Sequence, residues 1–578
     1  MINIIFIITF LVSIFCFSKE CVDWCIIPNT VILISFLAII SILLVCKREK
    51  LFITIWFVIS LIITVILYII GEKNCYSQYT LLAGILSFFL FFVKNMDNRF
   101  FNEKQLARVF PLFLVFEAIF GIVQFIQTGE TTQVKGHFDN SLGFAMALSF
   151  SIPFLLYTIK NDSKFFARSA IVVLGVIFIV LLISTSRSVL FASGLLILLY
   201  NSRIIWNYWK RCRGIVRIIF FVLVVFVIFI SYWLKQDSAN GRLLIWGTAF
   251  SMLWDQPWGY GLGGVAREYM NSQAVFLSGI RNSYWVNLSD NLNRVFSEYL
   301  AIGIEFGIVC MLFVFGGFLY IIRCILLEQD EKRKLFQALL FIVFFISLFS
   351  YPLYYPVSWV IIGYAICRLV RGDRYMLSVR PVFVVRCCLI ISLAIVVFYQ
   401  RDRLYDQKQW CSCARKALNG DVSVLEKEYP LLYTKLKGYP MFLYNYGAEL
   451  HYAGKYDLSC DVLDEYLQQV ADYDAWLLLA DNYYGQDRYS RAIDALKRAE
   501  KMCPGRFFPL YKQMLIYQRM GNKRECVQMA NRILDKKVKI PSTDIEQMKQ
   551  EALCILEKEE LSLNECLRDT IEYNYNGL

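Results

Sequence analysis

Residues 383–399, FVVRCCLIISLAIVVFY, form an apolar run that gives way at Gln400 to a polar sequence beginning with Arg401. A helix needs about twenty mainly apolar residues to cross the hydrocarbon core of a bilayer. The run approaches that length with Arg386 as its one charged residue. It therefore predicts a membrane span that leads into a soluble domain, and it divides the chain into a body, residues 1–400, and a tail, residues 401–578.

The body carries most of the apolar composition. Hydrophobic residues make up 58% of the 578 residues and charged residues 18%, whereas about a quarter of residues are charged in soluble domains. The mean hydropathy is +0.50. Because lipid offers backbone groups no hydrogen-bond partners, the spans must be helices, and we expect an all-α, polytopic membrane protein of about 12–13 transmembrane helices. Candidate spans begin near Ile4, Ile26, Leu51, Leu81, Val109, Leu142, Ala170, Ser188, Ile215, Phe296, Leu335, Pro356 and Phe383.

Lys and Arg residues set the expected orientation, because short cytoplasmic loops hold an excess of them. Basic clusters follow alternate spans, which places all of them in the cytoplasm. The loops near Glu20, Glu72 and Glu130, the long loop of about residues 235–295 and the tail then lie outside, on the opposite face of the membrane. The clusters also explain most of the net charge of +12, so no nucleic-acid partner is expected. They are Lys47, Arg48 and Lys50; Lys94, Arg99, Lys104 and Arg108; Lys160, Lys164 and Arg168; Arg203, Lys210, Arg211 and Arg213; Lys332, Arg333 and Lys334; and Arg371, Arg374 and Arg380.

The tail contains a repeating pattern of large and small residues. One unit starts at Trp476 and ends at Pro504, a second lies one period of about 34 residues upstream, and a third starts near Tyr511. The pattern resembles tetratricopeptide repeats, so we expect a solenoid of helical pairs whose concave face binds another protein or a substrate. An unrelated helical hairpin domain and a spacer are the alternatives. The positions that match in the first unit are Trp476, Leu479, Ala480, Tyr483, Ala492, Leu496, Ala499 and Pro504.

Polar residues at membrane depth are costly and are therefore candidates for function. The sequence Ser184-Thr185-Ser186-Arg187 lies at the outer end of the seventh span, where a guanidinium can hold a phosphate through two parallel hydrogen bonds. An arginine that extends from a helix end to water is the structural alternative. In the long loop, Arg242 follows Gly241 and opens an amphipathic segment. A run rich in glycine, residues 255–263, ends that segment, so the loop is expected to be a shaped structure.

Two acidic residues, Glu298 and Glu305, stand at the start of the tenth span. Their separation of seven residues places them on one face of a helix. A paired acidic face in lipid is hard to explain by packing alone. At the mouth of the sixth span, Lys135-Gly136-His137-Phe138-Asp139-Asn140 carries one of the two histidines of the chain.

Taken together, these segments resemble the O-antigen ligase family of membrane glycosyltransferases. The resemblance covers roughly residues 130–310 in motif and the first 400 residues in architecture. The repeat tail is similar to versions of this family with a fused periplasmic repeat domain. The segments that carry the resemblance are Gly136 to Asn140, Ser184 to Arg187, Gly241 to Gly263 and Glu298 to Gly307.

The resemblance implies an enzyme that uses neither metal nor cofactor. Such an enzyme takes a glycan from undecaprenyl diphosphate and joins it to an acceptor, usually lipid A core, in lipopolysaccharide biosynthesis. The two functional arginines of the family match Arg187 and Arg242, which would hold the diphosphate and stabilise the charge of the leaving group. The other residues expected to bind substrate are His137, Asn140, Ser186 and Glu305.

This chain departs from the family at the catalytic histidine. The position of that histidine falls at Phe296, which is followed by Ser297. A phenylalanine cannot accept a proton. Glu298 is the first replacement candidate, as a base or as a group that orients the acceptor, and His137 is the second.

Several functions remain open at the level of sequence. An O-antigen polymerase and a ligase that modifies a protein Ser or Thr would share the same donor-binding arginines. A non-catalytic membrane scaffold that acts through its repeat tail is an alternative of another class. Transport is disfavoured, because the pattern of spans shows no internal repeat of the kind found in transporters.

Overall fold

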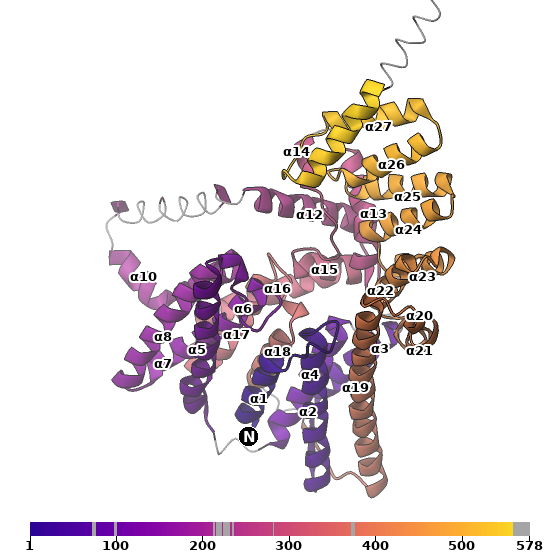
Figure 1. Cartoon of the computed structure of the whole chain (residues 1–578). Helices are drawn as coiled ribbons and strands as arrows, with labels where there is room; N and C mark the ends of the chain where they lie inside the picture. The colour runs from indigo at the N-terminus through magenta and orange to yellow at the C-terminus, as the bar shows by residue number, and fades with distance from the viewer. Residues whose placement is uncertain are drawn as a thin grey trace, which may run out of the picture.

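A computed structural model describes residues 1–71, 77–96, 101–211, 236–280, 283–370 and 376–558, together with a few single residues between 214 and 233. The described chain is built almost entirely of helices. Figure 1 shows the body below and the tail above, joined by the long helix α19. The helices of the body up to the long loop are α1 (Ile2–Phe15), α2 (Ile26–Lys47), α3 (Ile55–Ile70), α4 (Gln78–Asn95), α5 (Glu103–Thr128), α6 (Ser141–Ser149), α7 (Ser151–Asn161), α8 (Lys164–Ile183), α9 (Arg187–Tyr200) and α10 (Ser202–Arg211).

The long loop contains helices of its own, and the body resumes after it. Short 3-10 turns, η1 (Thr131–Gln133) and η2 (Pro352–Tyr354), lie in two of the connections. The loop helices are α12 (Gln236–Asp255), α13 (Gly264–Ser278) and α14 (Ser283–Leu288). The later helices of the body are α15 (Glu298–Phe306), α16 (Ile308–Leu327), α17 (Glu331–Ile346), α18 (Pro356–Leu369) and α19 (Phe383–Leu418).

The protein is a multi-pass membrane protein, but fewer of its helices have full spanning length than expected. Among the described residues, seven helices are long and apolar enough to cross a membrane, and the bent pair α9 and α10 would make an eighth. Helices α1, α3 and α18 are apolar but only 14 to 16 residues long, and at 1.5 Å per residue they are shorter than the hydrocarbon core. The expected ninth span, residues 215–234, lies mostly outside the described residues. The seven spanning helices are α2, α4, α5, the joined pair α6 and α7, α8, α16 and α19.

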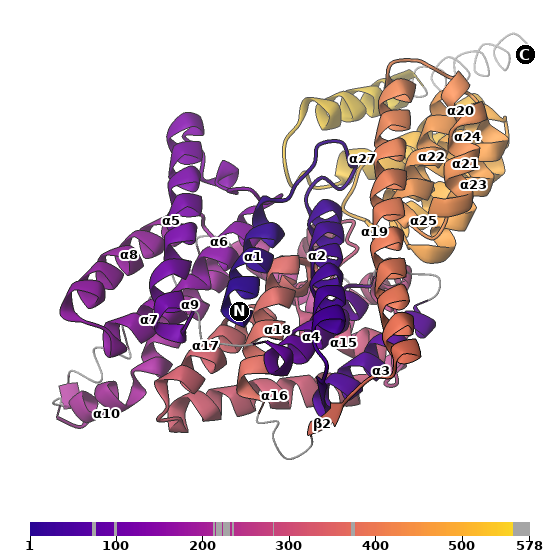
Figure 2. The same cartoon turned by 90° about the horizontal axis from the view of Figure 1, so that it is seen from below.

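A two-stranded antiparallel ribbon closes the body at the end away from the tail. Strand β1 (Leu51–Thr54) pairs with β2 (Met376–Val379) in a register that places Leu51 opposite Val379. β2 directly precedes the first residues of α19, whereas the tail follows the last residues of that helix (Figure 2). The ribbon therefore ties the connection before α3 to the connection before α19.

Helix α19 crosses the expected boundary at residue 400 without a break. It runs for 36 residues, from Phe383 to Leu418, which is about 54 Å at 1.5 Å per residue. Because a bilayer core is only about 30 Å thick, the second half of the helix stands outside it. The junction is therefore a continuous helix and not a flexible linker.

The tail is a stack of paired short helices, as the sequence predicted. Residues Gly447 and Ala480 let neighbouring helices approach: a Cβ added at Gly447 would lie 2.8 Å from the side chain of Leu463, and Ala480 is buried. The arrangement is that of a repeat-like solenoid, while the tetratricopeptide assignment stays a prediction. The pairs are α22 (Pro440–Tyr452) with α23 (Tyr456–Gln469), α24 (Tyr473–Gly485) with α25 (Tyr489–Met502), and α26 (Phe508–Arg519) with α27 (Lys523–Asp535), preceded by α20 (Ser423–Lys427) and α21 (Tyr429–Leu436).

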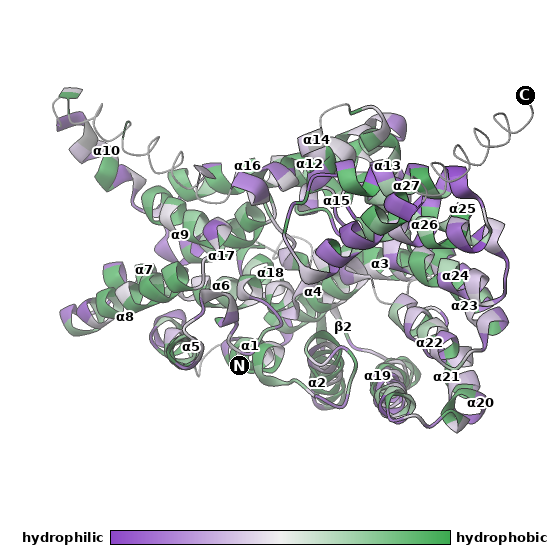
Figure 3. Cartoon of the chain, turned by 45° about the horizontal axis from the view of Figure 1, so that its top comes forward, coloured by the Kyte–Doolittle hydropathy of each residue, from purple (hydrophilic) through white to green (hydrophobic). Residues whose placement is uncertain are grey.

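The tail packs directly against the long loop. Buried residues of α12, α13 and α15 share one hydrophobic cluster with Tyr473, Ala499 and Met502 of the tail. Body and tail differ in the hydropathy of their residues. In Figure 3 the helices of the body are mostly hydrophobic, whereas those of the tail alternate between hydrophobic and hydrophilic residues. The loop helices are thus held between the body and the solenoid.

Candidate functional site

Arg187 is placed by a tight turn between two helices. Helix α8 ends at Ile183 and α9 begins at Arg187, so the connection consists of three residues. Thr185 in this turn has a φ of 55°, a left-handed conformation that a β-branched residue rarely adopts and that costs about 1–3 kcal/mol. The fold holds this strained turn next to the arginine that the sequence singled out. Ser186 is the residue directly before α9, and its side chain is half-buried.

Arg242 lies in α12 of the long loop and reaches the same neighbourhood as Arg187. Its guanidinium is 5.7 Å from the centre of the Phe296 ring. Trp246, one turn further on, donates a hydrogen bond from Nε1 to the Phe296 carbonyl oxygen at 3.4 Å. Burial lowers the pKa of Arg242, and the positive charge of Arg187 lowers it further. Two arginines that are distant in the sequence are therefore close enough to repel each other.

A third arginine, Arg294, extends this cationic group, and sequence reasoning missed it. Its guanidinium lies 3.5 Å from the centre of the Tyr354 ring and 5.1 Å from that of Tyr351. Burial raises the pKa of Tyr351, while the charges of Arg294 and Arg242 act in the opposite direction. Both cations thus act on Tyr351. The sequence did contain a signal for Arg294. It lies two residues before Phe296, the position at which the family that the chain resembles has its catalytic histidine.

Glu298 is buried at the start of α15 and is bonded to two other segments. Its Oε1 accepts a hydrogen bond from the backbone N–H of Leu353 at 2.9 Å, and its Oε2 accepts one from Gln78 Nε2 at 3.3 Å. Burial raises the pKa of this carboxyl to about 8. The contact with Leu353 lies in the turn that carries Tyr351 and Tyr354, so Glu298 holds the residues that surround Arg294.

Glu305 is separated from the membrane span that it was expected to enter. Helix α15 ends at Phe306, and Gly307, with a φ of 90°, redirects the chain into α16. The sequence predicted one continuous span from Phe296, and the glycine breaks it. Burial raises the pKa of Glu305 to about 7, opposed by a backbone hydrogen bond from Gly263 and by the charge of Arg267.

The glycine run of the long loop packs against this break. The backbone N–H of Gly261 donates to the Glu305 carbonyl oxygen at 3.1 Å. A Cβ added at Gly259 would lie 2.7 Å from the nitrogen of Gly307, and one added at Gly307 would lie 2.9 Å from the Pro257 oxygen. The glycines at these two positions therefore allow two backbones to approach each other, and the run forms the shaped loop that the sequence predicted.

His137 is held by a carboxylate that the sequence analysis did not single out. His137 Nδ1 and Glu117 Oε2 are 2.8 Å apart, and the backbone N–H of His137 donates to Glu117 Oε1 at 2.9 Å. Glu117 is fully buried in α5, and the ring of Phe120 stacks on His137 at 4.4 Å. The signal for Glu117 was a single acidic residue in an apolar span.

Asn140 has a structural contact at the start of α6. Its Oδ1 accepts hydrogen bonds from the backbone N–H groups of Leu142 at 2.9 Å and Gly143 at 3.1 Å. This is the N-cap arrangement that satisfies the free donors of a first helical turn. The cap fixes the loop that carries His137.

A cavity of about 330 Å³ lies where the body, the long loop and the tail meet. We call it the seam cavity. Glu305, Arg294 and Tyr354 line it, whereas Arg187, Arg242, Glu298 and His137 do not. Residues 438–441, Gln469 and Val470 of the tail also line it. Its remaining polar lining residues are Asp23, Thr30, Ser77, Gln78, Tyr79 and Arg403.

Comparison with known protein families gives a match over the segment that contains Arg187 and Arg242. Residues 170–315 match a family described as O-antigen ligase. The match runs from α8 into α16, so it includes Arg187, Arg242, Arg294, Glu298 and Glu305, while His137 and Asn140 lie outside it. A comparison with curated proteins returned no match. Residues 170–315 are thus similar to the O-antigen ligase family of ligase- and polymerase-type membrane glycosyltransferases.

Proposed function

We propose that the protein transfers a glycan from undecaprenyl diphosphate to a membrane acceptor, most simply lipid A core, in lipopolysaccharide biosynthesis. The observation that carries the proposal is the convergence of Arg187 and Arg242. They come from a helix of the body and a helix of the long loop, and their charges interact at the same place. Both lie in the segment that matches the O-antigen ligase family.

The two arginines suit the binding of a diphosphate. Each guanidinium presents several N–H donors in a fixed plane and stays charged in a partly buried site. Burial lowers the pKa of Arg242 most, and an anion between the two arginines would relieve the repulsion by Arg187 that lowers it further. In the transfer step, the bond between the anomeric carbon and the diphosphate oxygen breaks, and the leaving diphosphate keeps the electron pair. The arginines would stabilise that added charge in the transition state.

The acceptor hydroxyl oxygen attacks the anomeric carbon, and its proton must be removed. We propose Glu305 as the base that accepts this proton, because Glu305 lines the seam cavity and burial raises the pKa of its carboxyl to about 7. A base is most effective when its pKa lies near the working pH. Glu298, whose oxygens contact Leu353 and Gln78, is assigned the orienting role that the sequence analysis gave as one of its two options. His137, which contacts Glu117, then holds its own loop in place.

The proposed orientation places the arginines, the long loop and the tail in the periplasm of a bacterium. Its support is the distribution of Lys and Arg residues in the sequence. The tail and the arginines lie on one side of the body, since the tail packs on the loop helices that carry Arg242. A glycan donor that has been translocated to the periplasmic leaflet would meet the site there.

The proposal is tested by disrupting the gene in its host and separating the surface polysaccharide on a gel. Wild-type protein is expected to restore the long-chain lipopolysaccharide ladder, whereas Arg187→Ala and Arg242→Ala leave lipid-linked glycan to accumulate. Arg168→Ala, which changes an exposed arginine of α8, is the matched control and restores the ladder. A ladder restored by Arg187→Ala would contradict the diphosphate-binding role. A ladder unaffected by the disruption would favour a protein acceptor or a non-catalytic scaffold.

A further inference from the structure

A second and larger cavity lies in a part of the body that the family match does not cover. It has a volume of about 640 Å³ and runs between α2, α3, α4 and α19. We call it the groove. Its volume lies in the range of about 300–1,000 Å³ that is usual for small-molecule sites. Most of its lining is aliphatic or aromatic, including Phe57, Leu61, Phe88, Leu389 and Val396.

The groove follows α19 for much of the thickness of a membrane. Leu51 and Ile53 of strand β1 line one end, and Gln400 and Arg403 line the other. Leu389 and Arg403 are about 21 Å apart along the helix axis at 1.5 Å per residue, compared with about 30 Å for a bilayer core. An aliphatic chain that entered from the membrane would therefore fit lengthwise, with its polar end toward the tail.

The end of the groove nearest the tail is polar and buried. The side chain of Gln400 is 6% exposed, and its Oε1 has no hydrogen-bond partner among the described residues. A buried amide oxygen without a partner costs about 1–3 kcal/mol, so this atom points to a donor supplied by a ligand or water. Arg403, one turn further along the same helix, is also buried and carries a positive charge.

The groove and the seam cavity share lining residues. Arg403 and Leu81 line both of them. The seam cavity adds Arg294, and it also contains the carboxyls of Asp23 and Glu305, each with a pKa raised by burial. Two guanidinium groups beside carboxyls and amides can bind a head that has both an anionic group and hydroxyls. The apolar groove thus opens toward the place where Glu305 is proposed to act.

We propose that the groove and the seam cavity together form the binding site for the acceptor, an amphiphile with its acyl chain along α19 and its anionic sugar head between Arg403 and Arg294. This inference rests on the proposed function. The donor diphosphate is placed beside this site, at Arg187 and Arg242, because neither of them lines either cavity. Arg294 connects the two places, since it lines the seam cavity and acts with Arg242 on Tyr351. The tail has a direct role in this arrangement, since residues 438–441 cover the head.

Two pairs of variants test the site. Ser392→Trp puts a large ring into the groove, and Arg403→Gln removes the cation at its end. Ser169→Trp is the control for the first, because Ser169 is also an exposed serine on a spanning helix, bonded to a carbonyl of its own helix as Ser392 is. Arg401→Gln is the control for the second, since Arg401 is exposed and lies two residues away. Thermal unfolding of each variant establishes that it folds.

The full-length protein in nanodiscs is titrated with a lipid A core fraction that lacks O-antigen, and binding is measured by native mass spectrometry. We expect Ser392→Trp and Arg403→Gln to weaken binding by about tenfold or more, or about 1.4 kcal/mol, while both controls bind like the wild type. Unchanged binding by folded Ser392→Trp would overturn the proposal, as would no binding by the wild type. Equal competition by phosphatidylglycerol would identify a bulk lipid site, and displacement by undecaprenyl diphosphate a donor site; each result would also overturn it.

Binding in this experiment does not depend on glycan transfer. Arg187→Ala is expected to bind the core fraction like the wild type although its glycan transfer is strongly reduced. A protein that binds the fraction through the groove but never transfers a glycan would refute the proposed function and keep the acceptor site. Transfer that continues normally in Ser392→Trp at low acceptor concentration would refute the acceptor site and keep the proposed function.

Discussion

At the scale of single residues, the site separates side chains that bind charge from side chains that hold others in place. Arg187, Arg242 and Arg294 form a cationic group in which two members interact with Tyr351. Glu298 acts on this group indirectly, through the backbone of Leu353. The arginines are thus the residues whose loss should affect chemistry most directly.

Glu305 provides a test through pH. Its pKa is raised by burial to about 7, and a base works only when deprotonated, so transfer should fall about tenfold per pH unit below 7 and level off above it. Glu305→Gln should lower the rate by about 10²–10⁴-fold and remove this dependence. The measurement is the initial rate of transfer by purified protein from pH 5.5 to 8.5.

Glu298→Gln is the matched control for this experiment. A glutamine carbonyl can still accept the hydrogen bond from the Leu353 N–H, so the turn beside Arg294 should be kept. We expect Glu298→Gln to retain most of the rate and the pH profile. A strong loss in this variant, with Glu305→Gln nearly normal, would assign the base to Glu298.

At the scale of elements, much of the fold was predictable because it depends on apolar periodicity. Each expected span inside the described residues begins within a helix or a few residues before one, and the span expected from Leu51 starts with strand β1. The breaks were not predictable, because they depend on contacts between distant segments. Gly307 ends α15 where the loop at Gly259 packs on it, and nothing in the apolar run itself marks that position. Arg187 and Arg242 were singled out by local sequence pattern, and their role stays a prediction. The contacts of Arg294 with Tyr354 and of Glu117 with His137 join distant segments and could not be predicted from such a pattern.

The break at Gly307 should be sensitive to a single methyl group. Its φ is 90°, and an added Cβ would lie 2.9 Å from backbone atoms of Pro257 and Trp258. Alanine at such a position is strained and should cost more than about 1 kcal/mol. We expect Gly307→Ala to lower the thermal unfolding temperature in detergent and to reduce transfer. Gly316→Ala in α16, where nothing lies within 4 Å of an added Cβ, should leave both unchanged; equal effects of the two variants would contradict this account.

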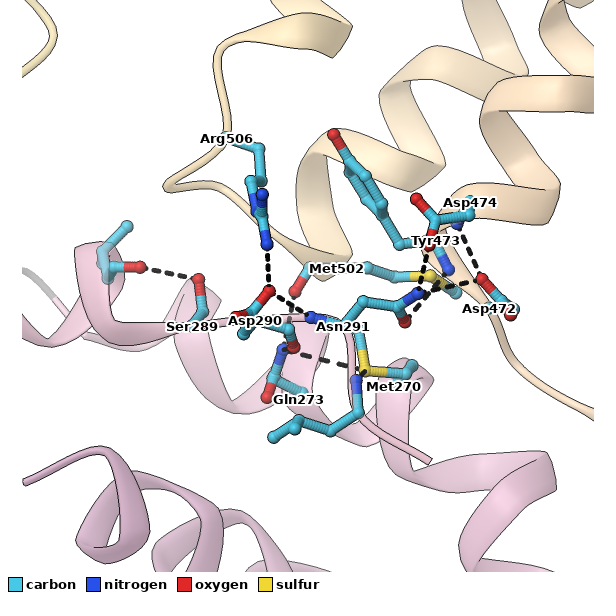
Figure 4. A network of polar contacts seen from close by, with 12 residues as sticks. Met270, Gln273, Ser289, Asp290, Asn291, Asp472, Tyr473, Asp474, Met502 and Arg506 are labelled. Carbon is cyan, nitrogen blue, oxygen red and sulfur yellow. Dashed lines mark hydrogen bonds and ion pairs between the residues drawn. The ribbon is translucent and has the colours of Figure 1, made fainter. Parts of the chain in front are cut away.

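At the scale of the whole molecule, the tail is part of the structure around the site and not a free arm. Figure 4 shows the network that joins it to the long loop. Asn291 Nδ2 donates to Asp472 Oδ1 and Asp474 Oδ2, each at 3.0 Å, and Asp290 pairs with Arg506. The loop helices that carry Arg242 therefore take their position from both the body and the tail.

Gln273 is the buried centre of this contact. Its Nε2 donates to the Met502 carbonyl oxygen at 2.8 Å and to that of Asp290 at 3.1 Å. Gln273→Leu leaves buried acceptors without a donor, at a cost of about 1–3 kcal/mol. We expect faster hydrogen exchange in residues 471–506 and weaker glycan transfer.

Gln513→Leu is the control for this variant. Gln513 is also buried, but its Nε2 donates to Glu500 within the tail. It should destabilise the solenoid without loosening its contact with the long loop. Two results would show that the tail does not position the loop. One is hydrogen exchange in Gln273→Leu equal to that of the wild type, and the other is faster exchange with an unchanged rate of glycan transfer.

The most direct test of the central claim uses purified protein in proteoliposomes with an undecaprenyl-diphosphate-linked glycan and lipid A core. The quantity measured is the release of undecaprenyl diphosphate together with formation of the glycan-extended lipid. The account predicts both products with the wild type and a loss of about 10²–10³-fold in Arg187→Ala and in Arg242→Ala. Equal product formation by the wild type and both variants, all correctly inserted, would contradict the claim that these arginines hold the donor diphosphate.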